Sequence, residues 1–314
     1  MKAVTIHNYG DPDVMVYEEM PTPSVAPDEV LIKIYAAGLN PVDWKIMEGY
    51  LKNARQYEFP LILGWDVSGV IESVGSNVTG FKPGDKVYAK PDPKRNGAYA
   101  EYISVKATEV ANMPKSLDFV TAASVPLAGL TAWQALFNFG ELKEGQRVLI
   151  IGASGGVGSF AVQFAKWKKA YVIGVASTKN MDFLKEIGAD EAIDYTTTEF
   201  DEVTDNIDLV LDAVGGEAKT RAWKVLKQGG KLVSITGKPD DSLPEASGKT
   251  GLAFMAGSNP SQLTEIAELI DKGIVRPIVS HVFTLEEAPK AISMLMKGEN
   301  PRGKIVLKVQ ETIQ

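Results

Sequence analysis

The sequence predicts a two-domain α/β protein, in which a β-rich domain precedes a domain built on a doubly wound parallel sheet. Three observations support this fold class. The chain has 314 residues, which is more than a single hydrophobic core usually supports. Its first part alternates apolar and polar positions between turn residues, as half-buried strands do. After residue 147, near-continuous apolar runs alternate with helical patterns, which is typical of a parallel sheet covered on both faces.

The composition is that of a folded globular protein. Hydrophobic residues make up 45% of the chain and charged residues 23%, so there is enough apolar surface for large cores. The net charge of −7 repels phosphate backbones and anionic lipids, so we expect no nucleic acid and no membrane as partner. The start lacks a signal-peptide pattern and no apolar run is long enough to span a bilayer, which predicts a cytoplasmic protein. The absence of cysteine excludes disulfides and thiolate zinc ligands.

The first part of the chain is predicted to be all β, built of short strands. Alternating runs lie at residues 28–36, 67–74, 86–89 and 98–105. Turn residues at 75–77 (GSN) and 82–85 (KPGD) separate them. From residue 118 the alternation stops, and the apolar stretch 122–139 predicts mostly helix instead.

The second part predicts alternating strands and helices. The strands are expected at residues 147–151, 171–176, 191–194, 208–213 and 231–235. Helical patterns between them lie at residues 156–169, 179–187 and 217–227. Further helices are predicted at 261–272 and 285–296, and a final strand at 304–309 is expected to return to the first domain.

A glycine-rich loop at residues 152–158 (GASGGVG) follows a predicted strand and opens a helix. A tight strand-to-helix turn needs a positive φ, which glycine adopts without strain. A backbone without Cβ also lets a pyrophosphate reach the N–H groups at the positive end of the helix. Gly158 would let that helix pack closely on the sheet. A flexible turn is the alternative, but the loop begins a strand–helix–strand series, so we expect a dinucleotide here.

The end of the second parallel strand indicates which dinucleotide binds. NAD-specific sites place an Asp or Glu there, on the ribose 2′-hydroxyl. This chain has Ser177, Thr178 and Lys179, and their hydroxyls and ammonium can bind a 2′-phosphate that a carboxylate would repel. Capping of the next helix is a second role for the two hydroxyls. We therefore expect NADPH rather than NADH.

Four segments together resemble one known family. They are residues 38–45 (GLNPVDWK), 64–69 (GWDVSG), 80–87 (GFKPGDKV) and 152–158. Over essentially the whole chain, the sequence is similar to the medium-chain dehydrogenase/reductase superfamily and, within it, to the zinc-free quinone oxidoreductase and enone reductase branch. The resemblance implies a GroES-like substrate domain at residues 1–122, completed by 275–314, and a Rossmann NADPH-binding domain at 123–274.

The resemblance also implies that the chain binds no metal. Zinc-dependent members of the superfamily carry a Cys near the position of Asn40 and Gly-His-Glu where this chain has residues 64–66 (GWD). The only histidines, His7 and His281, lie far from these segments in sequence and cannot rebuild a three-ligand site. Alcohol oxidation loses its Lewis acid without zinc, whereas reduction of an activated C=C does not need one, because the carbonyl spreads the developing charge.

Four residues are expected to be catalytic by resemblance: Asn40, Asp43, Lys45 and Tyr50. The Asn40 amide would hydrogen-bond to the nicotinamide carboxamide or the substrate carbonyl, and Lys45 or Tyr50 would donate to a developing enolate. For Asp43 the alternative is a structural residue that holds its loop. For Lys45 the alternative is a solvated surface lysine.

The expected cofactor contacts line the glycine loop, the ends of the parallel strands and the last segment of the chain. They are Asn40, Thr131, Gly152, Ser154, Gly155, Gly156, Val157, Ser177, Thr178, Lys179, Tyr195, Ala213, Val214, Ile235, Thr236, Phe254, Gly303 and Lys304. Tyr195 has the alternative of an aromatic residue at a sheet edge. Trp65, which stands where a zinc-dependent relative has its histidine, is expected to pack in the core, with stacking on the substrate as the alternative.

The sequence therefore predicts an NADPH-dependent, zinc-independent oxidoreductase that transfers a hydride to a quinone or an α,β-unsaturated carbonyl compound. Two alternatives remain: an enoyl-thioester reductase, and a non-catalytic NADPH-binding sensor or structural protein. By analogy with relatives that pair through the edge of the cofactor-domain sheet, an apolar edge strand at residues 252–256 favours a homodimer.

Overall fold

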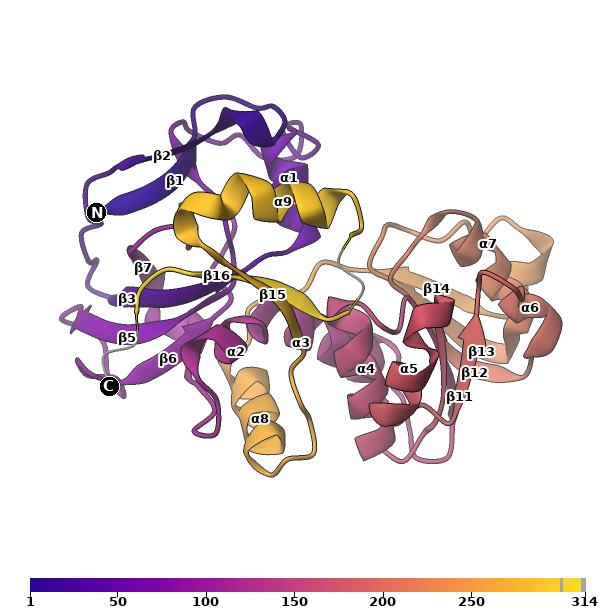
Figure 1. The fold of residues 1–314 in the computed structure, drawn as a ribbon. Coiled ribbons are helices and arrows are strands. Elements are labelled where there is room, and N and C mark those ends of the chain that lie inside the picture. Colours follow the sequence, from indigo (N-terminus) through magenta and orange to yellow (C-terminus); the bar gives the residue numbers. More distant parts are fainter. Residues whose placement is uncertain (300–301, 312–314) are drawn as a thin grey trace.

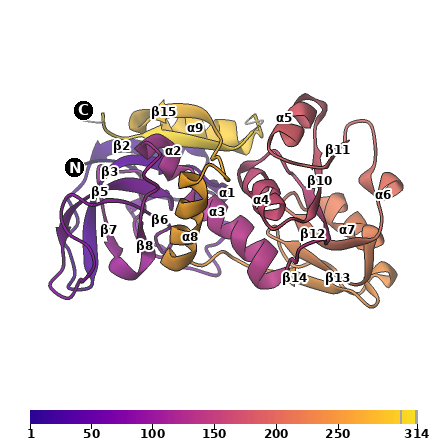
Figure 2. The same cartoon turned by 90° about the horizontal axis from the view of Figure 1, so that it is seen from below.

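The computed structural model describes residues 1–299 and 302–311, and in this part the chain forms two lobes side by side (Figure 1). The first lobe combines the N-terminal strands with the C-terminal segment, drawn in yellow. The second lobe holds the parallel sheet. Helices α3 (Pro126–Trp133) and α8 (Pro260–Asp271) lie where the lobes meet, as the view turned by 90° also shows (Figure 2).

Two sheets make up the first lobe. The smaller has the order β2 (Met15–Glu19), β1 (Lys2–Ile6), β4 (Leu61–Ile62). The larger has the order β15 (Val279–Thr284), β16 (Lys304–Lys308), β3 (Glu29–Gly38), β5 (Val67–Val74), β6 (Lys86–Ala89), β8 (Val110–Asn112), with β7 (Tyr102–Lys106) also paired to β3. Because β16 pairs antiparallel with β3, the expected return of the last strand to the first lobe is confirmed. Helices α1 (Pro41–Met47) and α9 (Ala288–Met296) pack against each other on this lobe.

The second lobe is a six-stranded parallel sheet. Its order is β11 (Glu191–Asp194), β10 (Tyr171–Ala176), β9 (Arg147–Ile151), β12 (Ile207–Asp212), β13 (Leu226–Ser234), β14 (Thr250–Ala253). Its helices are α4 (Gly156–Trp167), α5 (Met181–Glu186), α6 (Phe200–Val203) and α7 (Gly216–Val225). Alternate strand residues enter different cores: Val148 packs with α3, α4 and α5, whereas Leu149 packs with α6 and α7. Both faces are therefore covered, which explains the near-continuous apolar runs.

The stretch 122–139 is mostly helical, as expected: α2 (Phe119–Ala123) ends before Pro126 starts α3, and residues Gln134–Phe139 form a π-helical turn. Two other expectations about local structure were wrong. Residues 226 and 227 are strand rather than helix, since β13 begins at Leu226. The first part is not purely β, because α1 interrupts it. In the part of the chain with described coordinates, no helix has the length and apolarity to cross a bilayer.

Candidate cofactor and substrate site

The glycine loop forms a tight turn between β9 and α4. Gly152 has φ +83°, which favours glycine, and Gly155 is the N-cap of α4. A Cβ on Gly158 would lie 2.2 Å from the Gly152 carbonyl oxygen and 2.6 Å from Ala153 Cα, so only glycine fits there. The close packing expected at Gly158 is therefore a contact with backbone atoms of the loop itself. The first N–H groups of this twelve-residue helix lack intrahelical partners and form an anion-binding end.

Asp212 organises the neighbouring strand ends. Its buried carboxylate accepts hydrogen bonds from the N–H groups of Val214 (3.0 Å) and Gly215 (2.7 Å) and from the hydroxyls of Ser234 (2.7 Å) and Thr236 (2.8 Å). These bonds fix the ends of β12 and β13 beside the glycine loop. Sequence reasoning placed Ala213, Val214, Ile235 and Thr236 at this edge but missed the carboxylate that holds them. An Asp at the end of a buried apolar strand is the signal that was available.

The end of β10 carries the residues expected around a 2′-phosphate. Ser177 is half-buried, and Lys179 is exposed. The buried amide of Asn180 donates to the hydroxyls of Ser154 (3.2 Å) and Ser177 (3.1 Å), linking this segment to the glycine loop. Arg302 donates to Asn180 Oδ1 (3.0 Å) and to the Lys179 carbonyl (2.8 Å). The structure therefore adds a second cation, Arg302, which sequence reasoning did not assign to this place.

Thr178 and Tyr195 lie at the same edge of the sheet. The hydroxyl of Thr178 is 2.9 Å from that of Thr196, and hydrogen bonds from these two threonines hold the pKa of Asp194 below its usual range. Tyr195 is 59% exposed and is held through its backbone N–H, which donates to the Ala176 carbonyl. Its ring is thus available at the edge of the sheet, as both alternatives for this residue require.

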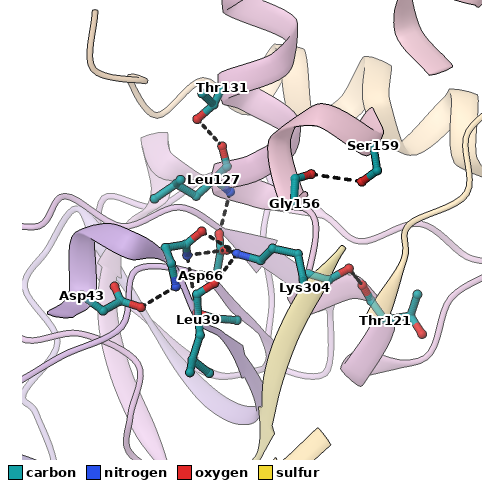
Figure 3. A network of polar contacts seen from close by, with 12 residues as sticks. Leu39, Asp43, Asp66, Thr121, Leu127, Thr131, Gly156, Ser159 and Lys304 are labelled. Carbon is teal, nitrogen blue, oxygen red and sulfur yellow. Dashed lines mark hydrogen bonds and ion pairs between the residues drawn. The ribbon is translucent and has the colours of Figure 1, made fainter. Parts of the chain in front are cut away.

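A buried polar network lies where the two lobes meet, with Lys304 at its centre (Figure 3). The Lys304 ammonium donates to the Leu39 carbonyl (2.5 Å), to Asn40 Oδ1 and to Asp66 Oδ2 (3.0 Å). Asn40 Nδ2 donates to Asp66 Oδ2 (2.8 Å), and Asp66 Oδ1 accepts from the Leu127 N–H (2.6 Å). The Asn40 amide is therefore held at both ends by the protein. Asp66 was not among the expected site residues.

Asp43 lies beside this network but is entirely buried. One of its oxygens accepts from the Asn40 N–H (2.7 Å) and the Tyr99 hydroxyl (2.7 Å), while Oδ1 has no partner. Asn40 and Asp43 together form a capping box at the start of α1. This geometry supports the structural alternative for Asp43. Burial raises the pKa of Asp43 to about 7, although hydrogen bonds from Tyr99 and Asn40 oppose the shift.

We expect Asp43 to make the stability of the protein depend on pH. Its pKa is about 7 in the folded state against the usual 3.8, so between about pH 4 and 7 the folded state keeps a proton that the unfolded chain releases. The free energy of unfolding should therefore fall as the pH rises through this window and stay level above it. Relative to Asp43→Asn, the wild type should lose about 2 kcal/mol between pH 5 and pH 8 in denaturant titrations. Parallel pH profiles for the two proteins would contradict this assignment.

Thr131 and Phe254 lie on two segments that contact each other. Thr131 is buried in α3 and donates to the Leu127 carbonyl (2.6 Å). Phe254 stacks on Phe139 with ring centroids 4.4 Å apart. The Gln134 amide exchanges hydrogen bonds with both backbone groups of Gly257 (2.9 and 3.0 Å), which ties residues 254–258 to the π-helical turn.

Lys45 lies in α1, where it is half-buried, and Tyr50 lies in the turn that follows this helix. The Lys45 ammonium is 5.6 Å from the centre of the Trp44 ring, and Tyr50, 70% exposed, meets the same ring edge-on at 5.8 Å. Gly49 and Tyr50 line a surface hollow of about 450 Å³. Neither side chain makes a hydrogen bond to the network of Lys304 among the described residues. Trp65 is fully buried in the core of the first lobe, as expected.

Comparisons with known proteins agree with this architecture. Residues 26–115 match the family described as alcohol dehydrogenase GroES-like domain, and residues 187–307 match the family described as zinc-binding dehydrogenase. The GroES-like and Rossmann architecture expected from the sequence is therefore confirmed.

Relatives match the chain over nearly its whole length. It is 39% identical to the 2-methylene-furan-3-one reductase of Solanum lycopersicum, over 98% of this chain and 79% of the relative. It is 37% identical to the chloroplastic NADPH-dependent alkenal/one oxidoreductase of Arabidopsis thaliana, with the same coverage. The solved structure of a quinone oxidoreductase from Coxiella burnetii superposes with a TM-score of 0.91 at 36% identity, over 99% of both chains. The chain belongs to the quinone oxidoreductase and enone reductase branch of the medium-chain dehydrogenase/reductase superfamily.

Proposed function

We propose that the chain is an NADPH-dependent oxidoreductase that reduces a quinone or the C=C bond of an α,β-unsaturated carbonyl compound without zinc. The observation that supports it most is the glycine cradle at residues 152–158, whose helix N-terminus lies on the same edge of the sheet as Lys179 and Arg302. A pyrophosphate and a 2′-phosphate need these two environments. The relatives reported above carry the matching activities in their names.

The residues present fit the cofactor. The glycine loop leads into the N-terminus of α4, whose first N–H groups lack intrahelical partners. A Cβ on Gly155 would meet no protein atom closer than 3.4 Å, so this position leaves room for a pyrophosphate that a side chain would block. We propose that Ser154 and Val157 complete the pyrophosphate site. The 2′-phosphate is held by Ser177, Thr178, Lys179 and Tyr195. The nicotinamide half of the cofactor is enclosed by Ala213, Val214, Ile235, Thr236, Phe254, Gly303 and Lys304. When bound, NADPH supplies the hydride.

The protein's own groups then position and polarise the reactants. Thr131 and Asn40 stand on the two lobes at the point where they meet, so they can enclose the nicotinamide from both sides. Asn40 Oδ1 and Nδ2 are already held by Lys304 and Asp66, which makes its orientation fixed before a ligand enters. A preorganised amide of this kind costs no reorganisation during the reaction. Lys45 or Tyr50 remains the proposed donor to a substrate oxygen.

Zinc does not fit this site, although one matching family is described as zinc-binding. Zinc in catalytic sites takes sulfur, imidazole and carboxylate ligands. The chain has no cysteine, His7 is bonded to Glu18, and His281 lies on β15. Among the described residues, no group of three or more His, Asp or Glu side chains is placed to hold a metal. Asp66, the carboxylate at this place, is already paired with Lys304.

Steady-state oxidation of NADPH tests the function directly. Chelator-treated protein is incubated with NADPH and a panel of quinones, alkenals, enones and acyl thioesters. We expect turnover with quinones or enones. Turnover confined to acyl thioesters would instead show an enoyl-thioester reductase. Tight NADPH binding with no turnover on the whole panel would show a sensor.

Lys179→Glu should reverse the preference for NADPH. Replacing the ammonium by a carboxylate removes a charge-assisted hydrogen bond and adds repulsion, so the Kd for NADPH should rise by roughly 10- to 100-fold. The Kd for NADH should change by less than about threefold, because NADH has no 2′-phosphate. Fluorescence titration of both dinucleotides measures this. Lys185→Glu, the same charge change on the exposed face of α5, is the matched control, and equal effects of the two variants would contradict the assignment.

The remaining features are proposals of the same kind. We propose a substrate domain at residues 1–122 with 275–314 and a cofactor domain at 123–274. Strand β14 (Thr250–Ala253) is the last strand of the parallel sheet, at slightly earlier residues than the expected 252–256, and its free edge supports a homodimer. Sedimentation analysis tests that state. The cytoplasmic location stays a prediction, since the Arabidopsis relative is chloroplastic.

A further inference from the structure

The Lys304 ammonium occupies a cage of oxygens inside the protein. Its side chain is only 5% exposed, and its three N–H donors meet three acceptors, the Leu39 carbonyl, Asn40 Oδ1 and Asp66 Oδ2. Asp66 is fully buried, and the ammonium is its only ion-pair partner among the described residues. Buried charges are tolerated only when they are paired and hydrogen-bonded in this way. The cage is thus a cation site that the chain fills with its own side chain.

The Lys304 side chain is linked to the three elements around the proposed reduction site, namely α1, α3 and the glycine loop. At its tip, it holds Asn40, the N-cap of α1. Through Asp66, it is connected to the Leu127 N–H in the first turn of α3, the helix that carries Thr131. Its stem lies against the cofactor loop, because a Cβ on Gly156 would come within 2.9 Å of Lys304 Cδ.

The strand that carries Lys304 is also fastened to the cofactor loop. The Gly303 N–H donates to the Ser154 carbonyl (2.9 Å), and Gly155 and Gly303 form an isolated parallel bridge. The stem of Lys304 is therefore anchored on the cofactor side while its ammonium is bound on the substrate side. A misplaced reacting group of about 1 Å costs roughly 100-fold in rate, so a link of this kind bears directly on hydride transfer.

We propose that Lys304 is a positioning residue for hydride transfer, whose tethered ammonium is held between Asn40 and Asp66. This inference rests on the proposed function. It assigns to Lys304 a role beyond lining the nicotinamide: the ammonium sets the orientation of the Asn40 amide and the distance between the two lobes at the reacting carbon. The positive charge, rather than the length of the side chain, is what the cage requires.

Chemical rescue separates the charge from the packing. Lys304→Ala should lower kcat for the best quinone or enone about 100-fold at saturating NADPH. Propylammonium, which replaces the missing atoms with their charge, should restore at least tenfold of the loss, and neutral propanol should restore none. Lys308→Ala, on the same strand with its ammonium paired to Glu311 at the surface, is the control and should keep wild-type kcat. Absence of amine rescue, or equal rescue by propanol, would overturn the proposal.

A second variant guards against simple loss of the fold. Lys304→Met with Asp66→Asn removes both buried charges, which avoids an unpaired one. We expect this double variant to fold and to bind NADPH, with kcat as low as in Lys304→Ala. Wild-type kcat in the double variant, or failure to fold, would make Lys304 a purely structural residue and overturn the proposal. A wild-type protein without turnover would refute the proposed function itself, and this inference with it.

Discussion

Gly158→Ala should abolish NADPH binding at any practical concentration, with a Kd at least 1000-fold above that of the wild type. The new methyl would lie 2.2 Å from the Gly152 carbonyl oxygen, and the atoms it meets are backbone atoms that cannot rotate away. The loop must therefore move, and its N–H groups leave hydrogen-bonding range of the pyrophosphate. Charge-assisted hydrogen bonds contribute roughly 1.5 to 3 kcal/mol each, so losing two of them accounts for about 4 kcal/mol.

Gly129→Ala is the matched control for this variant. Its added methyl would sit in α3 at ordinary contact distances of 3.4 to 3.9 Å from Val125 and Ile266. It should leave the Kd for NADPH within about threefold and stabilise the helix slightly, since alanine is the better helix former. Isothermal titration with NADPH measures both variants. If Gly158→Ala bound NADPH as the wild type does, the cofactor would not lie on this loop.

Asp66→Asn should lower the free energy of unfolding by about 3 to 5 kcal/mol. The substitution leaves the Lys304 ammonium buried without a counter-charge, and breaking one side of a buried ion pair has this order of cost. Guanidinium denaturation at pH 7 measures the change. Adding Lys304→Met to Asp66→Asn should recover part of the loss, because the unpaired charge is gone.

A double-mutant cycle over these two positions decides whether the pair is coupled. We expect a coupling free energy above about 1 kcal/mol, as for residues that share one hydrogen-bond network. Asp43→Asn in the same assay is the control for the neighbouring carboxyl group of Asp43, which bonds to Tyr99 rather than to Lys304. A loss below about 1 kcal/mol for Asp66→Asn would show that the pair is solvated in solution.

The fold was predictable because its main signals are local. The loop at residues 152–158 joins a strand to a helix within a short segment, and in the structure Gly152 has a positive φ while a Cβ on Gly158 would find no room. The helix that was expected to continue to residue 227 ends two residues earlier, and the cause is not local. Leu226 enters a core and begins β13, a tertiary preference that helical periodicity cannot detect.

The centre of the site was only half predictable. Asn40 and Lys304 were expected through family resemblance, but their mutual contact joins residues 264 positions apart and has no local signal. Asp66 and Tyr99 were missed because each resembles an ordinary strand-end residue until the fold brings it to Asn40 or Asp43. Arg302 was not expected near the 2′-phosphate, because its reach to Asn180 depends on the packing of the two lobes.

The most direct test of the proposed reduction is the position of the transferred hydrogen. Metal-depleted protein, with zinc verified below a tenth of an atom per chain, is incubated with an enone and NADPH carrying deuterium at C4 of the nicotinamide. We predict a saturated ketone or aldehyde with one deuterium at the former β-carbon, found by NMR. Deuterium at the carbonyl carbon of an alcohol product, or turnover that appears only after zinc is returned, would contradict the account.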